Sequence, residues 1–287
     1  MKLEDLTKEV WAVSDTHGCF EEFKEGLDKI NFHENENIIV IHNGDAIDRG
    51  PQSIPNIMYI KNHPRILATP GNHDLMMVQY FRDQEIERGV WFGNGGVEVV
   101  KELLSLGMIN IVNEGQQHQF QGGDGTLFAA TKEFIELIQW IEELPRYIEF
   151  DDWFVSHSGG NFNNGKTIED QTDFTWTWSR DEFLKGEKLE GKQHVIGHTM
   201  TTVIRSEHFH VYEETFEAEF APVAVPGAIA IDGGVNIGGY LFFMKLDFNE
   251  TKVVTIPSKN TEKTEAIKEK LELPASQIRQ LKEEGKL

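Results

Sequence analysis

The sequence contains almost no cysteine: Cys19 is the only one in 287 residues. A single thiol cannot form an intramolecular disulfide, so the fold must be held together by a core. With 39% apolar residues, 19 of them phenylalanine, the chain can build one. Cys19 itself is expected to pack in that core rather than to act as a redox thiol. The composition therefore favours a soluble protein of a reducing compartment, which we expect to be the cytoplasm.

Long apolar runs and an excess of positive charge are also missing. No segment approaches the roughly 20 apolar residues that cross a bilayer, and residues 1–5 do not resemble a signal peptide. The 27 basic residues are outnumbered by 48 acidic ones, which gives a formal net charge of -21. Such a charge opposes attraction to nucleic acid and to anionic membranes. We expect neither as a partner, and a phosphate-binding site would need local cations.

What the chain does contain is a series of short apolar strands. In the first half they alternate with helices around residues 20–30 and 54–58, and this order predicts a parallel sheet. The second half, from residue 147, is rich in strands and closes with an antiparallel pair. The expected strands are residues 10–13, 38–41, 65–68, 152–155, 194–196, 228–231, 240–248 and 252–256. The sequence thus predicts an α/β fold.

Four other segments give weaker signals. Residues 115–125 are rich in Gln and Gly, which predicts an exposed loop. His208 and His210 alternate like strand residues that face solvent, and the acidic insertion at residues 209–226 has no clear pattern. Residues 258–287 mix Lys and Glu, so we expect a charged, partly helical tail after a single domain over residues 1–257.

Polar side chains follow these strands at their carboxyl ends, where parallel sheets bind ligands. The densest cluster is residues 43–50, which contains Asp45, Asp48 and Arg49 between glycines. The other members are Asp15, His17, Asn72, His73, His157, Arg180 and His198. Carboxylate, imidazole and amide donors without thiolates suit manganese, iron or zinc, and six candidate ligands exceed the needs of one open catalytic site. Each residue alone could be a helix cap or a structural histidine, but the ordered set favours two metals.

The spacing of these residues resembles a known signature. The motifs are Asp15-X-His17, Gly44-Asp45-X-X-Asp48-Arg49-Gly50, Gly71-Asn72-His73-Asp74, Ser156-His157 and Gly197-His198-Thr199. In this order, over about residues 10–248, they resemble the calcineurin-like metallophosphoesterases and, among these, the bacterial and phage phosphoprotein phosphatases. The resemblance implies two facing mixed β-sheets flanked by helices in four layers. It also implies hydrolysis of phosphomonoesters, above all phosphoserine and phosphothreonine in proteins.

The resemblance implies a role for each site residue. The first metal would be held by Asp15, His17 and Asp45, and the second by Asp45, Asn72, His157 and His198. Both would be divalent ions, manganese before iron or zinc, and a hydroxide bridging them would be the nucleophile. His73, paired with Asp48, would protonate the leaving oxygen. Phosphate oxygens would be bound by Arg49, Arg180 and Asn72.

Two alternatives remain open. The first is a nucleotide phosphoesterase, above all a symmetrical bis(5'-nucleosyl)-tetraphosphate hydrolase, which residues 71–75 also resemble. The tetraphosphatase pattern lacks an acid at the position of Asp48, so the Asp48 and His73 pair favours the phosphatase. An inactive protein that only binds phosphorylated partners is the second alternative, and the complete set of ligands argues against it. Asp232 could support the site from behind. The tryptophans Trp91, Trp176 and Trp178 could wall the cleft or pack in the core.

Overall fold

The computed structural model describes residues 8–82, 88–210, 213, 215–250 and 252–271. In its first sheet, β1 (Glu9–Val13), β2 (Ile38–Asn43) and β3 (Ile66–Thr69) run parallel, which confirms the prediction for the first half. The closing strands β12 (Tyr240–Lys245) and β13 (Val253–Pro257) are antiparallel and extend this sheet in the order β13-β12-β1-β2-β3. The two ends of the chain therefore build one sheet.

The second sheet also contains three parallel strands. Its central strands β8 (Trp153–Val155), β9 (Gln193–Ile196) and β11 (Ala228–Ala230) are parallel. Antiparallel edge strands β7 (Ile148–Phe150) and β10 (Val223–Val225) complete the order β10-β11-β9-β8-β7. Both sheets thus place the carboxyl ends of three parallel strands side by side.

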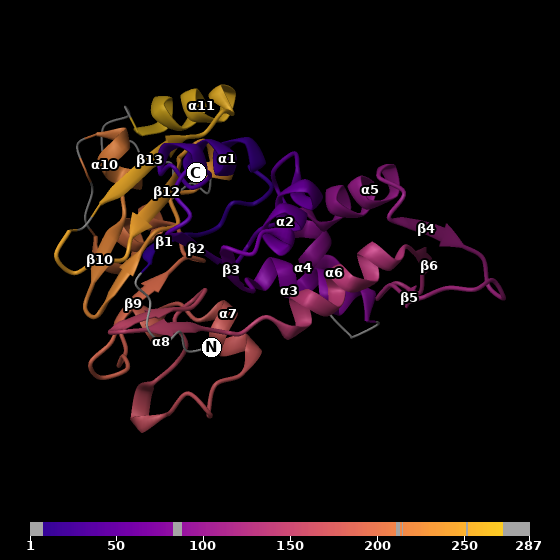
Figure 1. The fold of residues 1–287 in the computed structure, drawn as a ribbon, viewed down its shortest axis with the longest axis horizontal. Helices are drawn as coiled ribbons and strands as arrows, with labels where there is room; N and C mark the ends of the chain where they lie inside the picture. The colour runs from indigo at the N-terminus through magenta and orange to yellow at the C-terminus, as the bar shows by residue number, and fades with distance from the viewer. Residues whose placement is uncertain (1–7, 83–87, 211–212, 214, 251, 272–287) are drawn as a thin grey trace.

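The two sheets pack face to face, and the alternation of side chains along each strand shows it. Val10 and Ala12 of β1 share a core with Trp153 and Val155 of β8, whereas Trp11 points to the opposite face of the first sheet. Residues on both faces of these strands are apolar, so each sheet needs a covering layer on both of its faces. The result is a sandwich covered by helices on both outer sides (Figure 1).

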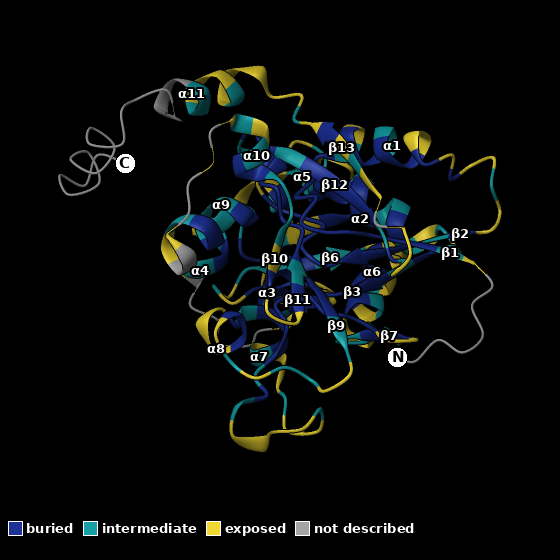
Figure 2. Ribbon diagram, turned by 90° about the vertical axis from the view of Figure 1, so that its left-hand side faces the viewer, coloured by how far each residue is buried: buried dark blue, intermediate teal, exposed yellow. Residues whose placement is uncertain are grey.

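Helices pack around both sheets, and several, such as α1, are buried on one side and exposed on the other (Figure 2). On the first sheet, α1 (Phe20–Lys29) contacts β12 and β13, and α2 (Ser53–Asn62) contacts β3. The same core continues through α3 (Asn72–Phe81), α5 (Val97–Ser105) and α6 (Lys132–Glu143), and both α5 and α6 pack on α2. The helices on the second sheet are α7 (Asp173–Trp178), α8 (Asp181–Leu184) and α9 (Thr201–Val203) with the π-helical turn η3 (Ile204–Phe209). The four-layer α/β architecture expected from the resemblance is confirmed.

Two expectations for connecting segments are wrong. Residues 115–125 are not all exposed loop: β5 (Phe120–Gln121) joins β4 (Ile109–Val112) and β6 (Leu127–Ala130) in a small third sheet at the far end of Figure 1. Phe120 is buried there against Phe81 and Phe134, a long-range contact that overrides the local Gln and Gly signal.

The second error concerns the strand expected at His208 and His210, because neither lies in one, although His210 is exposed as expected. Their segment continues α9 as the π-helical turn η3, and His210 ends it in a left-handed conformation with φ 55°. A three-residue alternation is too short to specify a strand, and Ile204 instead anchors the helical turn in the outer core of the second sheet. In the insertion at residues 209–226, the described part contains α10 (Phe216–Phe220) and β10.

The described part of the tail is helical and attached to the body. α11 (Thr261–Leu271) follows a segment in which the Lys259 N–H donates to Glu22 Oε1 at 2.8 Å. Lys263 Nζ donates to the Asn236 carbonyl at 2.9 Å, and Thr264 Oγ1 donates to the Gly238 carbonyl at 2.8 Å. The boundary at residue 257 stays a prediction. Among the described helices, none has the length and apolar character needed to cross a membrane.

His194 is a buried polar residue in an apolar setting. It lies on β9 with no exposed surface, and its ring is 4.8, 5.2 and 5.8 Å from the rings of Phe154, Phe183 and Phe162. Neither ring nitrogen has a hydrogen-bond partner in the described part of the chain. Burial, with a smaller effect of the Lys188 charge, lowers the pKa of His194 to about 3.

We therefore expect His194 to weaken the fold in acid. The unfolded chain would protonate it below about pH 6.5 while the folded chain would not, so stability is lost as the pH falls from 6.5 towards 3, by about 3 kcal/mol between pH 7 and pH 4. In His194→Leu this loss disappears, and urea unfolding at several pH values measures it. His118→Leu, at an exposed histidine, is the matched control. Parallel pH dependence in the wild type and His194→Leu would refute the expectation.

Candidate functional site

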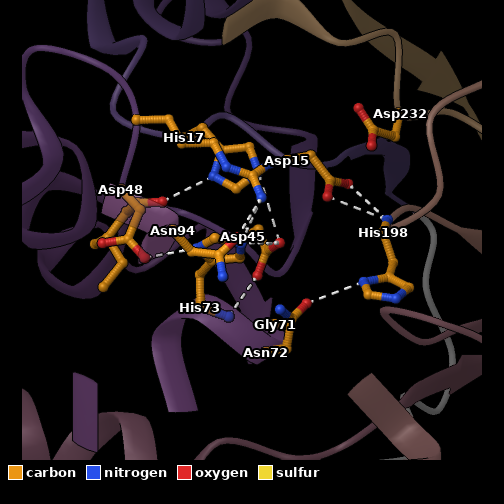
Figure 3. A network of polar contacts seen from close by, with 12 residues as sticks. Asp15, His17, Asp45, Asp48, Gly71, Asn72, His73, Asn94, His198 and Asp232 are labelled. Carbon is orange, nitrogen blue, oxygen red and sulfur yellow. Dashed lines mark hydrogen bonds and ion pairs between the residues drawn. The ribbon is translucent and has the colours of Figure 1, made fainter. Parts of the chain in front are cut away.

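The predicted site residues converge at the carboxyl ends of the parallel strands of both sheets. Each polar cluster sits directly after a strand because the apolar run ends there and the chain turns. Asp15 and His17 follow β1; Asp45, Asp48 and Arg49 follow β2; Asn72 and His73 open α3 after β3; His157 follows β8 and His198 follows β9. In Figure 3, Asp45 lies near the centre of the network, with Asp48 and Asn94 on one side and Asn72 and His198 on the other.

The backbone of the site is unusual. Six of its non-glycine residues have a positive φ: Asp15 (51°), His17 (43°), Asp45 (54°), Asp48 (71°), Arg49 (67°) and His198 (63°). This left-handed region is sparsely populated by residues with a side chain, and such strain gathers at functional sites. Gly44, at φ 80°, lets the turns approach closely, since a Cβ there would lie 2.6 Å from His157 Nδ1. The turns therefore aim several side chains at one point.

Hydrogen bonds join the two sheets where the carboxyl ends of their parallel strands meet, a boundary that we call the seam. Asn43 Nδ2, at the end of β2, donates to the Ser156 carbonyl at 3.0 Å. His157 Nδ1 donates back to the Asn43 carbonyl at 2.8 Å, and the His198 N–H donates to both oxygens of Asp15 at 3.1 Å. The site is therefore shared between the sheets, and its geometry depends on their docking.

Two groups of side chains could hold a metal ion, and Asp45 belongs to both. The first is His17, Asp45 and His73; the second is Asp45, His157 and His198, and in each group the ligand atoms lie within 4.8 Å of one another. Asp45 Oδ2 is 3.7 Å from His17 Nε2 and 3.5 Å from His157 Nε2. Asn72 Oδ1 is beside the second group, 2.9 Å from His198 Nδ1. The arrangement suits two metals that share a carboxylate.

The charge balance of the site also fits cations. Five carboxylates, each no more than 4% exposed, are buried around it: Asp15, Asp45, Asp48, Asp74 and Asp232. Buried anions need positive charge or hydrogen bonds to offset their desolvation. In addition, His198 Nε2 is buried without a hydrogen-bond partner among the described residues. An orphaned imidazole nitrogen next to excess carboxylate is what a divalent ion would satisfy.

Burial shapes the protonation of these ligands. It lowers the pKa of His17 and of His198 well below the ordinary value, so both rings are neutral near pH 7 and offer a lone pair. Burial also raises the pKa of Asp15, with Asp232 adding repulsion. For Asp45 and His157 burial is outweighed by their mutual attraction: the pKa of Asp45 falls well below its usual range, and that of His157 rises to about 10.

A second set of contacts lies on the Asp48 side of Asp45. His73 Nδ1 donates to Asp48 Oδ2 at 2.5 Å, which orients the ring. The guanidinium of Arg49 reaches His17 Nε2 at 3.0 Å and His73 Nε2 at 2.9 Å. This places the Arg49 cation against His17 and His73 of the first metal group, where a phosphate ester could bind.

Arg180 stands at the opposite edge of the site. It is exposed, precedes α8 and donates from NH1 to Thr199 Oγ1 at 3.0 Å, next to His198. It lines a cavity of about 600 Å³ together with Trp178. Trp178 is half-buried, with its ring 5.9 Å from that of His198, whereas Trp91 and Trp176 are buried. Of the three tryptophans, Trp178 therefore lines a cavity beside the site.

Three contributors were not expected from the sequence. Asp74 accepts hydrogen bonds from the N–H groups of Asp45 (2.9 Å), Ala46 (3.1 Å) and Gly71 (2.8 Å). These bonds join the turn after β2 to the turn after β3. The place of Asp74 in the Gly71-Asn72-His73-Asp74 motif was the available signal. Asn43 lies in the cluster of residues 43–50 but had no assigned role, and Trp91 was left open between the cleft wall and the core, with no sign of its contact with Asp48. Asp232 does lie behind the site, as considered, and receives the Gly234 N–H at 2.9 Å.

Comparison with known proteins agrees with this geometry. A family model described as calcineurin-like phosphoesterase matches residues 8–225. The chain is 26% identical over 250 residues to serine/threonine-protein phosphatase 2 of Salmonella typhimurium, covering 84% of this chain and 94% of that relative. To the symmetrical bis(5'-nucleosyl)-tetraphosphatase of Buchnera aphidicola it is 37% identical over 73 residues, 25% of this chain and 26% of that relative.

A solved structure described as a candidate diadenosine tetraphosphatase shares the fold. It matches with a TM-score of 0.54 and 17% sequence identity, covering 91% of this chain and 98% of that one. The family match includes strands of both sheets, and the residues that converge where the sheets meet include two groups able to hold metal ions. The chain belongs to the calcineurin-like phosphoesterases and is a metal-dependent phosphoesterase.

Proposed function

We propose that this protein is a dinuclear-metal phosphomonoesterase that acts on phosphoserine and phosphothreonine in proteins. The observation that carries the proposal is the shared position of Asp45, whose carboxylate belongs to both possible metal groups, while the Arg49 guanidinium contacts His73 of the first group. A site of this kind can bind a phosphoryl group, activate water and supply a proton within one small volume.

In the proposed site the metals divide the ligands as the family resemblance implies. The first would be held by Asp15, His17 and Asp45, and the second by Asp45, Asn72, His157 and His198. Manganese is the favoured ion, with iron and zinc as other ions that this donor set suits. Two such ions supply Lewis acidity and lower the pKa of bound water towards neutrality.

The remaining residues would act on the ester itself. Arg49 and Arg180 would bind the phosphate oxygens from opposite edges, with Asn72 as an additional donor, because a guanidinium offers paired N–H groups to an oxyanion. His73 would deliver a proton to the leaving oxygen. Its ring is oriented for this by Asp48, which accepts from Nδ1 at 2.5 Å and leaves Nε2 facing Arg49.

A dinucleoside tetraphosphatase is the second candidate, and a specific observation favours it. The fold match to a candidate diadenosine tetraphosphatase covers 91% of the chain. Against it, the sequence likeness to the named tetraphosphatases is limited to about a quarter of the chain, whereas the likeness to the serine/threonine phosphatase covers 84%. The buried contact between Asp48 and His73 also suits an ester whose leaving group needs a proton.

Substrate preference tests the proposal directly. We expect purified protein with manganese to hydrolyse a phosphoserine peptide with a kcat/KM at least about 10-fold higher than for diadenosine tetraphosphate, the scale of discrimination that a few specific contacts provide. Asp45→Asn, prepared in parallel, shows whether the activity belongs to this site. A preference for the dinucleotide would replace the proposed substrate. A failure to hydrolyse p-nitrophenyl phosphate from neutral to alkaline pH would leave only a binding role.

A further inference from the structure

The segment of residues 91–95, far from the metal groups in sequence, packs against Asp48 and Arg49. Trp91 ends α4 (Arg88–Trp91) with its side chain fully buried. Its Nε1–H points at the Asp48 carboxylate, 3.0 Å from Oδ2 and 3.2 Å from Oδ1. Asp48 Oδ2 is the same oxygen that accepts from His73 Nδ1. Trp91, Asp48 and His73 therefore form a continuous hydrogen-bonded row.

The residues that follow Trp91 hold the neighbouring arginine. Asn94 belongs to the π-helical turn η1 (Phe92–Gly96); its Oδ1 accepts from Arg49 NH2 at 3.4 Å, and its Nδ2 donates to the Val90 carbonyl at 2.7 Å. Gly95 has φ 116°, and a Cβ there would lie 2.7 Å from the backbone nitrogen of Arg49 and 3.0 Å from the Asp48 Cβ. Only a glycine allows this contact.

We propose that residues 91–95 form a clamp that positions the Asp48–His73 pair, and that Trp91 is a positioning residue for proton delivery to the leaving oxygen. The inference rests on the proposed role of His73 and deepens it. Trp91 is fully buried and would act on the reaction through Asp48, to which it donates.

The need for such a clamp follows from the surroundings of Asp48. Its carboxylate is fully buried, its backbone is in the left-handed region at φ 71°, and its N–H donates to Ser53 Oγ at 3.0 Å. A buried carboxylate whose donors are lost turns towards others or pulls its partner out of place. Trp91 is a rigid donor, held by Tyr80 and Phe92 with ring centroids 5.1 and 5.6 Å away. It fixes the carboxylate against rotation.

The consequence depends on the leaving group. A serine alkoxide is a poor leaving group and requires a proton, whereas p-nitrophenolate departs as a stable anion and requires almost none. A misplaced His73 should therefore slow the phosphoserine peptide and spare p-nitrophenyl phosphate. A general loss of structure would slow both substrates equally.

The test compares three variants on both substrates with manganese. In Trp91→Phe, which keeps a ring but removes the N–H, we expect kcat for the phosphoserine peptide to fall about 10-fold or more, the effect of one hydrogen bond to a charged group, with kcat for p-nitrophenyl phosphate within about 2-fold of wild type. His73→Asn should show the same pattern with a larger loss. Phe81→Leu opens a cavity in the same aromatic cluster without touching a polar group. The ratio of its kcat values for the two substrates should therefore equal that of wild type.

Nuclear magnetic resonance provides a readout that does not depend on turnover. In zinc-loaded protein, the Nδ1 proton of His73, held 2.5 Å from Asp48, should give a signal far downfield that is absent in His73→Asn. We expect Trp91→Phe to shift or broaden this signal and Phe81→Leu to leave it in place. An unchanged signal in Trp91→Phe, or an equal loss of rate on both substrates, would overturn the inference. Wild-type protein that hydrolyses neither ester would contradict the proposed function instead.

Discussion

Asp45→Asn is expected to weaken metal binding about 100-fold or more and to remove most activity, because the residue that both metal groups share loses its charge. Asparagine keeps an oxygen that can accept from the His73 N–H, now 3.0 Å from Asp45 Oδ1, and it tolerates the left-handed backbone at φ 54°. The substitution therefore tests the charge rather than the fold. Metal content after gel filtration and the rate with p-nitrophenyl phosphate are the two measurements.

His73→Asn separates the two roles. If His73 delivers a proton rather than binding metal, its loss should lower kcat for a phosphoserine peptide by about 10²-fold to 10⁴-fold while metal content stays close to wild type. The opposite outcome has a structural basis, since His73 Nε2 lies 4.0 Å from Asp45 Oδ2 and in one of the two metal groups. Equal metal loss in both variants would make His73 a ligand. Asp28→Asn, at an exposed aspartate, is the control for the loss of a carboxylate elsewhere.

Removal of the metals with a chelator is expected to abolish activity and to lower the melting temperature. The proposed ligands come from both sheets: Asp45 follows β2 of the first, and His157 and His198 follow β8 and β9 of the second. A bound ion would thus stabilise the docking of the sheets as well as the turns. One site at 100 times its Kd contributes about 2.7 kcal/mol, which corresponds to about 4–5 °C for a chain of this size.

Re-addition and a variant make this measurement specific. Manganese added back should restore both activity and melting temperature, followed by calorimetry at fixed protein concentration. In Asp45→Asn the same additions should move the melting temperature much less, because the shared ligand is changed. If the chelator changed neither the melting temperature nor the activity, a metal site at the seam of the sheets would be excluded.

Much of the central architecture could be predicted from local sequence. Apolar runs such as residues 38–41 are long enough for a buried strand and too short for a helix, so their order specifies the parallel sheet. The polar residues after them had to meet, since parallel strands end at one edge. That argument brought Asp15, Asp45 and Asn72 together without knowledge of any contact.

The features that were missed depend on distant parts of the chain. Phe120 lies in a strand because its ring packs against Phe81 and Phe134, and nothing within residues 115–125 signals this contact. Trp91 could be assigned to the cleft wall or to the core but not to Asp48, because that partner lies 43 positions earlier. Asn43 likewise looks like a turn residue, although its side chain joins two sheets. Local patterns identify which residues are special; tertiary contacts decide what each of them holds.

The left-handed backbone at six site residues has a consequence for how such a protein can change. Each position costs about 1 kcal/mol relative to a relaxed conformation, and together they approach the 5–15 kcal/mol by which a typical fold is stable. Glycine would relieve the strain at any of them, but every replacement would remove a carboxylate, an imidazole or a guanidinium from the seam. Selection for stability and selection for activity therefore act in opposite directions at these positions, and gains in stability must come from elsewhere in the chain.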